Sequence, residues 1–370
     1  MSRGKIKNYY PGGNTSKGFY SFYEYLPYGA ERIFVIKGGP GTGKSTFMKK
    51  IAYDMVDKGY DIELHWCSSD NESLDGLLIP DLKVALLDGT APHMVDPKYP
   101  GAIDEIINLG RYWDRELIEE GKEKIVGLSK SIWNCFNRAY AYLAEAKLIH
   151  DEWEECYLEG MDFQAANKIT KDLIEEILDG EKLADELGKD RHLFGSAFTP
   201  NGAVDYFDNI TEDIETRYII KGRPGTGKST LMKKVAESAR ERGFEVAYFH
   251  CSFDPASIDM IVIEELSVAL IDGTAPHVVD PVRVGDKVVD MLECVDSEIV
   301  EKNTPQIDQV KARYNVVMDN ALASIQQAKA LHDNLEEFYI EAMDFEAIEE
   351  RRVDAFNEIL DWADIKGYLK

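Results

Sequence analysis

The sequence predicts an α/β fold that occurs twice along the chain, each copy continuing into a helical part. Three observations lead to this prediction: two motifs return almost unchanged in the second half, short apolar runs alternate with helical patterns around them, and stretches with helical periodicity follow. The chain has 370 residues, which is enough for two ordinary domains. A hydrophobic fraction of 44% is normal for a folded protein.

An internal repeat determines the domain organisation. KGGPGTGKSTFMKK at residues 37–50 returns as KGRPGTGKSTLMKK at 221–234, with 12 of 14 positions identical. DGTAPHMVDP at 88–97 returns as DGTAPHVVDP at 272–281, with 9 of 10 identical. Both motif pairs are 184 residues apart, and AKLIHDEWEECYLEGMDF at 146–163 matches AKALHDNLEEFYIEAMDF at 328–345. Such extended self-similarity indicates duplication and fusion.

The boundary between the repeats is expected near residue 187. The first repeat then covers residues 1–187, with an α/β core over about 1–100 and a helical part over about 101–187. The second covers residues 188–370, with a core over about 188–285 and a helical part over about 286–370.

Each core opens with a Thr-x-x-Gly turn, at residues 15–18 and 199–202, and continues with apolar runs. The runs that predict strands are 33–37, 61–67 and 84–88 in the first repeat and 217–221, 245–251 and 268–272 in the second. Continuous apolar runs are typical of parallel strands that are buried on both faces. Strands that alternate with helices predict a layered α/β domain.

The helical parts carry apolar residues at steps of three or four, which place one stripe on each helix. The stripes are Phe136, Tyr140, Leu143, Ala146, Ile149, Trp153 and Tyr157, and Tyr314, Val317, Ala321, Ile325, Ala328, Leu331, Leu335 and Phe338. Such a stripe is the packing seam of a helical hairpin or bundle, or else a groove for a partner. Asp162 and Asp344 are expected to cap the N-termini of further helices.

The motif at residues 37–50 and its copy at 221–234 each contain a complete phosphate-binding loop, Gly-x-x-x-x-Gly-Lys-Ser. Its glycines let backbone N–H groups surround phosphates, the following helix N-terminus adds partial positive charge, and its lysine reaches the β- and γ-phosphates. The sequence thus predicts two tandem P-loop NTPase domains with small, mostly parallel sheets, each with an appended helical hairpin or bundle. The expected nucleotide-binding residues are Gly38, Gly39, Pro40, Gly41, Thr42, Gly43, Lys44, Ser45 and Thr46, and Gly222, Arg223, Pro224, Gly225, Thr226, Gly227, Lys228, Ser229 and Thr230.

The magnesium ligands are expected to be the loop serines and a strand-end aspartate in each repeat. Ser45 and Ser229 supply a hydroxyl in the P-loop pattern. Asp88 and Asp272 end apolar runs forty-four residues after their loop lysines, where a carboxylate can face the Mg²⁺ shell. The alternative is a turn cap after a core strand.

Four further residues are candidate catalytic groups. His93 and His277 follow the strand-end aspartates by five residues, where an imidazole can orient water, sense the γ-phosphate, or hold the loop by hydrogen bonding. Asp70 and Asp254 follow the second strand of each repeat, where a carboxylate can activate water or a substrate hydroxyl. A turn closed by an aspartate side chain is the alternative for this pair.

Two motifs that are common in other P-loop proteins are absent from the sequence, and this limits the reactions to be expected. Gly89 and Gly273 follow the strand-end aspartates in place of a glutamate base, and no Asn-Lys-x-Asp motif is present. The sequence therefore favours a slow Mg-dependent ATPase that couples nucleotide state to movement of the helices. A small-molecule or nucleotide kinase, and a non-enzymatic ATP-dependent switch that binds a protein partner, are the alternatives.

The composition argues against nucleic-acid-binding, membrane-spanning and secreted proteins. A net charge of −26 makes nucleic-acid binding a poor expectation, since phosphate backbones require Lys and Arg. No run of about 18 apolar residues predicts a membrane span, no apolar signal segment is present, and a cytoplasmic location is expected. The five cysteines are expected to be reduced. Besides ATP and Mg²⁺, the sequence leaves open a small-molecule or protein partner.

With GGPGTGKST and DGTAPH both present, the chain resembles a family of bacterial tandem P-loop ATPases over nearly its whole length. The resemblance implies ATP binding on Lys44, Ser45, Lys228 and Ser229 with the glycines around them, and it implies no substrate. One difference separates the two loops, because Gly39 of the first is Arg223 in the second. The two sites are therefore expected to differ in affinity or rate.

Overall fold

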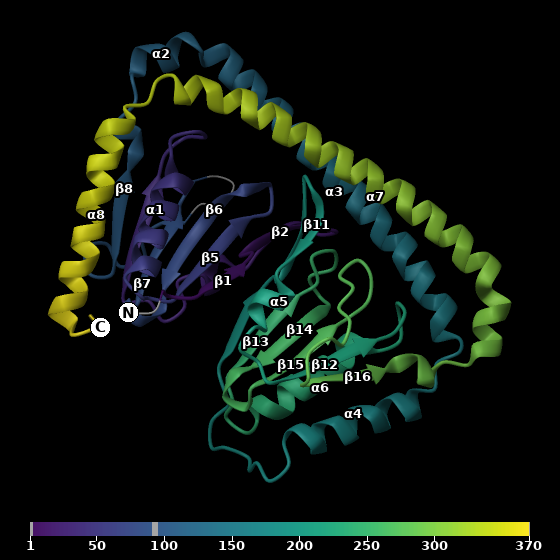
Figure 1. Cartoon of the computed structure of the whole chain (residues 1–370). Helices are drawn as coiled ribbons and strands as arrows, with labels where there is room; N and C mark the ends of the chain where they lie inside the picture. The colour runs from purple at the N-terminus through teal and green to yellow at the C-terminus, as the bar shows by residue number, and fades with distance from the viewer. Residues whose placement is uncertain (1–2, 91–94, 370) are drawn as a thin grey trace. The chain divides into compact units, whose positions relative to one another are not determined.

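The computed structural model describes residues 3–90 and 95–369, and the chain divides into two compact units. The first unit comprises Met1–Gly12, Ser21–Asn137 and Ser324–Lys370, and the second comprises Gly13–Tyr20 and Arg138–Ala323. Each unit contains a six-stranded sheet with helices packed against it (Figure 1). The expected α/β fold is confirmed.

The sheet of the first unit is mixed but mostly parallel. In spatial order it consists of β1 (Ile6–Tyr9), β5 (Ile62–Cys67), β6 (Asp70–Ile79), β7 (Val84–Asp88), β4 (Arg32–Lys37) and β8 (Asp104–Asn108). Strand β4 pairs in parallel with β7 and β8, β1 pairs in parallel with β5, and β6 is antiparallel to both of its neighbours. The strand that leads into the P-loop therefore lies directly beside the strand that ends at Asp88.

The second unit repeats this arrangement. Its strands, in spatial order, are β9 (Asp190–Leu193), β13 (Val246–His250), β14 (Ile258–Ile263), β15 (Val268–Asp272), β12 (Thr216–Lys221) and β16 (Asp286–Asp290). Strand β14 is the antiparallel member, and the other pairings are parallel. Two short hairpins, β2 (Gly12–Thr15) with β3 (Gly18–Ser21) and β10 (Ser196–Thr199) with β11 (Gly202–Asp205), contain the expected Thr-x-x-Gly turns.

The apolar runs predict the central strands correctly to within one residue at either end. Strands β4 and β7 have continuous apolar centres, whereas in β5, IELHWC, the polar residues Glu63 and His65 alternate with apolar ones. The strands β6 and β8 and their counterparts were not expected. The first four residues of β6 are polar, and β8 and β16 each contain only two apolar residues, so these segments lack a continuous apolar run. Strand β14, IDMIVI, was missed although only Asp259 interrupts its apolar run. Strand β8 and its counterpart β16 lie in segments predicted to be helical.

Helices cover the sheets of both units. The α-helices are α1 (Lys44–Asp57), α2 (Arg115–Glu120), α3 (Lys122–Leu158), α4 (Phe163–Ile177), α5 (Phe207–Ile210), α6 (Lys228–Arg240), α7 (Ser297–Ile340) and α8 (Phe345–Lys366). Short 3-10 segments are Tyr23–Tyr25, Pro80–Leu82, Leu109–Arg111, Glu264–Leu266 and Met291–Cys294. The predicted caps are confirmed, because Asp162 accepts N–H bonds at the start of α4 and Asp344 does so at the start of α8.

The packing combines the sheet of one repeat with helices of the other. In the first unit, α8 packs beside α1 and contributes Ile348, Ala355 and Ile359 to the core (Figure 1). In the second unit, α4 packs beside α6 and contributes Leu173. Motif spacing along the chain does not reveal this exchange. The duplication boundary near residue 187 stays a prediction, since it concerns the origin of the sequence.

The long helices α3 and α7 lie side by side (Figure 1). Within the second unit, Ala146 and Ile149 of α3 pack on Val310 and Val317 of α7. The apolar stripes therefore form internal core along this seam, which was the first of the two expectations. Across residues 3–90 and 95–369, no helix is both long enough and apolar enough to cross a bilayer.

Candidate nucleotide-binding site

The two P-loops have the same local structure. Each follows a buried strand and leads into a helix that begins at its lysine, α1 at Lys44 and α6 at Lys228. The ammonium of Lys44 donates to the carbonyl oxygen of Gly39 at 2.7 Å, and that of Lys228 donates to the carbonyl oxygen of Arg223 at 3.0 Å. Both lysine side chains therefore lie over their own loop, in a position from which the ammonium group could contact a phosphate bound there.

A carboxylate from the neighbouring strand faces each lysine. The Nζ–Oδ2 distance is 3.6 Å for Lys44 and Asp88 and 3.5 Å for Lys228 and Asp272. Burial raises the pKa of Asp88, and the charge of Lys44 opposes this shift. The structure brings the predicted aspartates to the P-loops, where an added cation would relieve the cost of a buried carboxylate.

The loop serines lie at the same edge of the sheet. The Oγ of Ser45 accepts the N–H of Leu74 at 3.0 Å, and the Oγ of Ser229 accepts the N–H of Ile258 at 2.9 Å. Each hydroxyl is therefore fixed in position and retains a lone pair. A serine hydroxyl and a nearby aspartate are oxygen ligands of the kind that Mg²⁺ uses beside substrate phosphates, so both sites fit this ion.

A second carboxylate in each site was not predicted. Asp75 on β6 and Asp259 on β14 are buried, and burial raises the pKa of each carboxyl to about 6. Tyr23 and Cys67 hydrogen-bond to Asp75, and the charge of Lys44 acts on it. The sequence signal is an aspartate at the same place in both repeats, in SLDGLLI and SIDMIVI, inside an otherwise apolar run.

Cys67 and Cys251 lie next to these buried aspartates. Burial raises the pKa of both thiols well above the usual value, and the adjacent carboxylate raises it further. The structure therefore holds both as neutral thiols, which gives no support to a nucleophilic cysteine.

Asp70 and Asp254 close turns and also face a lysine. Asp70 accepts hydrogen bonds from the N–H of Glu72 and the hydroxyl of Ser73, and Asp254 accepts one from the N–H of Ala256. Both expectations for this pair, a turn cap and a group at the site, are therefore compatible with the geometry.

The loop that contains DGTAPH is tied to the P-loop strand. Lys221 donates to the carbonyl oxygens of Gly273 and Val279 and pairs with Asp280, and Lys37 makes the matching contacts with Gly89, Val95 and Asp96. These two lysines were not among the predicted site residues. Their signal is a lysine at the start of each P-loop motif.

Of the two candidate histidines, only His277 can be placed, because His93 lies outside the described residues. His277 is buried, its Nδ1 lies 3.3 Å from Asp205 Oδ2, and its ring packs against Phe207. These contacts favour the loop-holding role of His277.

A long helix borders each P-loop within its own unit. In the first unit, the Oε1 of Glu336 on α7 accepts the N–H of Gly41 at 3.1 Å. A Cβ on Gly41, whose φ is +66°, would lie 2.8 Å from the Glu336 carbonyl oxygen. In the second unit, a Cβ on Gly225 would lie 2.9 Å from the Glu154 carbonyl oxygen of α3. Both positions therefore need glycine for the close approach of the helix.

The same helices bring lysines to the turn aspartates. Lys329 of α7 lies 3.6 Å from Asp70, and Lys147 of α3 lies 3.5 Å from Asp254. The helix residues belong to one pattern, Lys-x-x-His-Asp-x-x-Glu, that both repeats contain. We refer to it as the helix motif: Lys147, His150, Asp151 and Glu154 on α3, and Lys329, His332, Asp333 and Glu336 on α7.

Comparison with known proteins matches residues 205–261 to the family Nephrocystin 3, N-terminal. The matched segment contains β12, the second P-loop, α6 and β13, and it ends within β14. It indicates a P-loop NTPase-related domain and supports nucleotide binding. No curated protein and no solved structure shows significant similarity to the chain.

Arg223 allows a test of the difference between the sites. A guanidinium that makes a charge-assisted hydrogen bond to phosphate should tighten binding by about 1.5–3 kcal/mol, whereas one in solvent contributes about 0–1 kcal/mol. Arg223 is exposed, and its guanidinium makes no ion pair within the part of the chain that the structure describes. We therefore expect Arg223→Gly to weaken ATP binding at the second site by less than about fivefold.

Calorimetry in a Lys44→Ala background isolates this site, and Gly39→Arg in a Lys228→Ala background is the reciprocal test. A Cβ at Gly39 would lie 2.6 Å from the ring of Tyr339, so this second change should perturb the first site more. A loss of affinity above tenfold for Arg223→Gly would show that the arginine reaches the phosphates.

Proposed function

We propose that this chain binds Mg-ATP at both P-loops and hydrolyses it slowly, and that the nucleotide state controls the position of the long helices. The observation that carries the proposal is the lysine–aspartate pair beside each P-loop, Lys44 with Asp88 and Lys228 with Asp272. Lysine and the loop N–H groups would hold the phosphates, and Ser45 with Asp88 and Ser229 with Asp272 would hold Mg²⁺.

When bound, Mg²⁺ would neutralise charge on the β- and γ-phosphate oxygens. The carboxylates Asp70 and Asp254 are the candidates that could orient a water molecule, because they follow the strands β5 and β13, Asp70 as the first residue of β6 and Asp254 in the loop before β14. His277 is assigned to holding the loop, and the sequence match between the repeats suggests the same role for His93. No glutamate follows Asp88 or Asp272 in the sequence, and this is consistent with slow turnover.

A kinase would require free arginines near an acceptor pocket. Three arginines of the sequence are not free for such a role: Arg283 donates to Thr211 and Asp208, Arg115 pairs with Glu119, and Arg191 is buried. The helix motif beside each P-loop is compatible with a non-enzymatic switch as well as with an ATPase. Phosphate release separates the three functions, since an ATPase releases phosphate alone, a kinase yields ADP with a phosphorylated product, and a switch releases almost none.

Asp88→Asn and Asp272→Asn test the magnesium assignment. We expect each substitution to slow turnover at its site and to raise the Mg²⁺ concentration that half-maximal turnover requires, while nucleotide affinity falls less. The reason is that the loop N–H groups still hold the triphosphate after the metal ligand is lost. Phosphate release during a Mg²⁺ titration is the measurement.

Asp81→Asn serves as the control, because this aspartate lies on the 3-10 turn before β7 and away from the P-loop. An unchanged rate together with an unchanged Mg²⁺ titration in both site variants would disprove the assignment. A screen for metabolites that raise ADP production would identify an acceptor if the chain is a kinase.

A further inference from the structure

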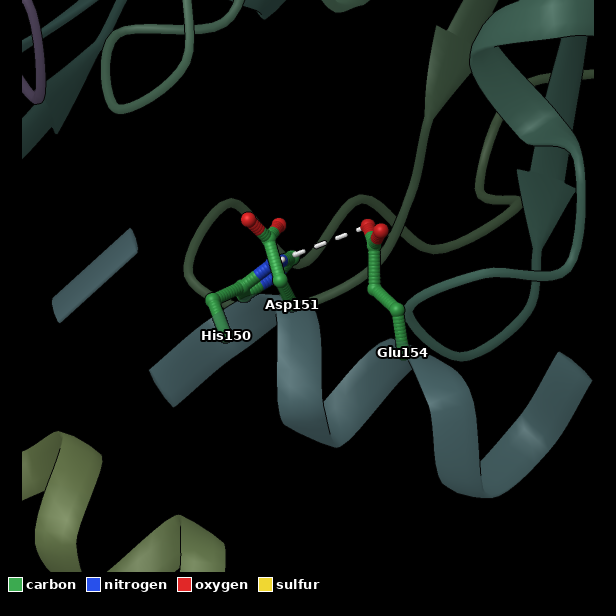
Figure 2. A group of neighbouring side chains, drawn as sticks. All are labelled: His150, Asp151 and Glu154. Carbon is green, nitrogen blue, oxygen red and sulfur yellow. Dashed lines mark ion pairs between the residues drawn. The ribbon is translucent and has the colours of Figure 1, made fainter. Parts of the chain in front are cut away.

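The helix motif places charged groups in the same arrangement in both units. His150 Nδ1 lies 3.6 Å from Glu154 Oε1 on α3, and His332 Nδ1 lies 3.8 Å from Glu336 Oε1 on α7. Figure 2 shows that His150, Asp151 and Glu154 project from the same side of α3. The lysine that starts the motif faces Asp70 in the first unit and Asp254 in the second, and in the first unit the glutamate that ends the motif contacts the P-loop.

In the first unit this glutamate, Glu336, accepts a hydrogen bond from a backbone N–H group of the P-loop. The N–H of Gly41 belongs to the loop whose N–H groups would surround a triphosphate, and it donates to Glu336 Oε1 at 3.1 Å. A carboxylate oxygen accepts hydrogen bonds and carries negative charge, as a phosphate oxygen does. The Gly41 N–H directed at the carboxylate is unavailable to phosphate, and two anions at one place repel each other.

The second unit has the equivalent glutamate at the same loop position. The Glu154 backbone packs against Gly225, as the Glu336 backbone packs against Gly41. Burial raises the pKa of the Glu154 carboxyl, and the charges of Lys147 and of the P-loop lysine Lys228 oppose that rise. Glu154 therefore lies within the electrostatic reach of the second phosphate site.

We propose that Glu336 is a built-in competitor of phosphate that occupies the first P-loop until a bound triphosphate displaces it, and that Glu154, whose backbone packs against Gly225, has the same role at the second P-loop. This inference rests on the proposed nucleotide binding and adds how the site is regulated. Because Glu336 belongs to α7, its displacement releases a contact between that helix and the loop. By linkage, whatever favours the docked helix weakens nucleotide binding, and nucleotide weakens helix docking to the same extent.

The test compares Glu336→Gln with its parent in a Lys228→Ala background, in which only the first site binds. Glutamine keeps the length and the helix propensity of the side chain but removes the charge. We expect Mg-ATP to bind about tenfold more tightly to the variant, a change of ~1.4 kcal/mol at 25 °C. Calorimetry with Mg-ATP and with tripolyphosphate should give the same gain, because the competition concerns the phosphates alone.

Two controls separate local competition from a change in overall charge. Glu337→Gln removes the same charge from the next position of α7, which is exposed, and should leave the affinity within about twofold of the parent. Glu336→Asp keeps the charge but shortens the side chain, and it should also tighten binding. In the second unit, Glu154→Gln in a Lys44→Ala background should reproduce the gain.

The outcomes distinguish this inference from the proposed function. If the parent binds Mg-ATP and Glu336→Gln binds it equally or less tightly, the competition is disproved and nucleotide binding stands. If neither protein binds Mg-ATP, the proposed function fails and the inference fails with it. Tighter binding to Glu336→Gln but not to Glu337→Gln supports the competition.

Discussion

Lys44→Ala and Lys228→Ala are each expected to remove one of two ATP-binding events in a calorimetric titration. Each ammonium would make charge-assisted hydrogen bonds to the β- and γ-phosphates, and such a bond contributes about 1.5–3 kcal/mol. Loss of two of them lowers the affinity of that site by roughly 10²- to 10⁴-fold. The double variant should show no binding at concentrations that saturate the parent.

Lys50→Ala and Lys234→Ala are the matched controls for this experiment. They lie on the same helices, α1 and α6, and their partners are Glu349 and Asn167 rather than groups of the P-loop. Both variants should bind two equivalents of Mg-ATP. Parent-like affinity in the Lys44→Ala, Lys228→Ala double variant would show that the nucleotide site is elsewhere or absent.

The sequence predicts the parts of the fold that repeat a strong local pattern. Strands such as β7, VALLD, are buried on both faces and so consist of continuous apolar residues. Strand β6 escapes prediction because its first half, Asp70–Ser73, is polar, and the apolar half alone is short. The exchange of α4 and α8 between the repeats depends on contacts across long sequence separations, and local periodicity carries no information about these.

In the candidate site, too, some residues are predictable from the sequence and others are not. Motif spacing leads directly to Lys44 and Asp88, because a P-loop lysine and a strand-end carboxylate are recognisable by position. Asp75 and Glu336 occur at matching places in both repeats, but their sequence context does not indicate that they lie beside a P-loop. What identifies them is position in the structure, beside Lys44 and on the Gly41 N–H respectively.

The second unit contains a buried ion pair that has no counterpart at the matching strand positions of the first unit. Arg217 of β12 is 1% exposed and makes two bonds to Asp286 of β16, at 2.7 and 2.8 Å. The equivalent of Arg217 in the first repeat is Ile33, which lies opposite Asp104 in the same register. Arg217 also pairs with Asp208, whose side chain is 76% exposed.

The hydrogen bonds from Arg217 hold the pKa of Asp286 well below its usual range, against an opposing effect of burial. A carboxyl whose pKa is lower in the folded than in the unfolded state stabilises the fold above the unfolded value, about 3.9. This contribution is lost as the pH falls below about 4, through the folded pKa. The pair should therefore stabilise the second unit at neutral pH, and its contribution to the free energy of unfolding should be lost in acid.

Arg217→Ala should lower the free energy of unfolding of the second unit by about 3–5 kcal/mol at pH 7, because it leaves the buried Asp286 carboxylate without its partner. Urea unfolding measures the change, and hydrogen exchange of the β12 and β16 amides assigns the transition to the second unit.

Asp208→Asn removes the exposed partner and should lower the free energy of unfolding by at most about 1 kcal/mol. Arg217→Ile with Asp286→Ala removes both buried charges and should be less destabilising than Arg217→Ala alone. An equal loss in the single and the double variant would show that packing of the arginine side chain, and not the unpaired carboxylate, causes the destabilisation.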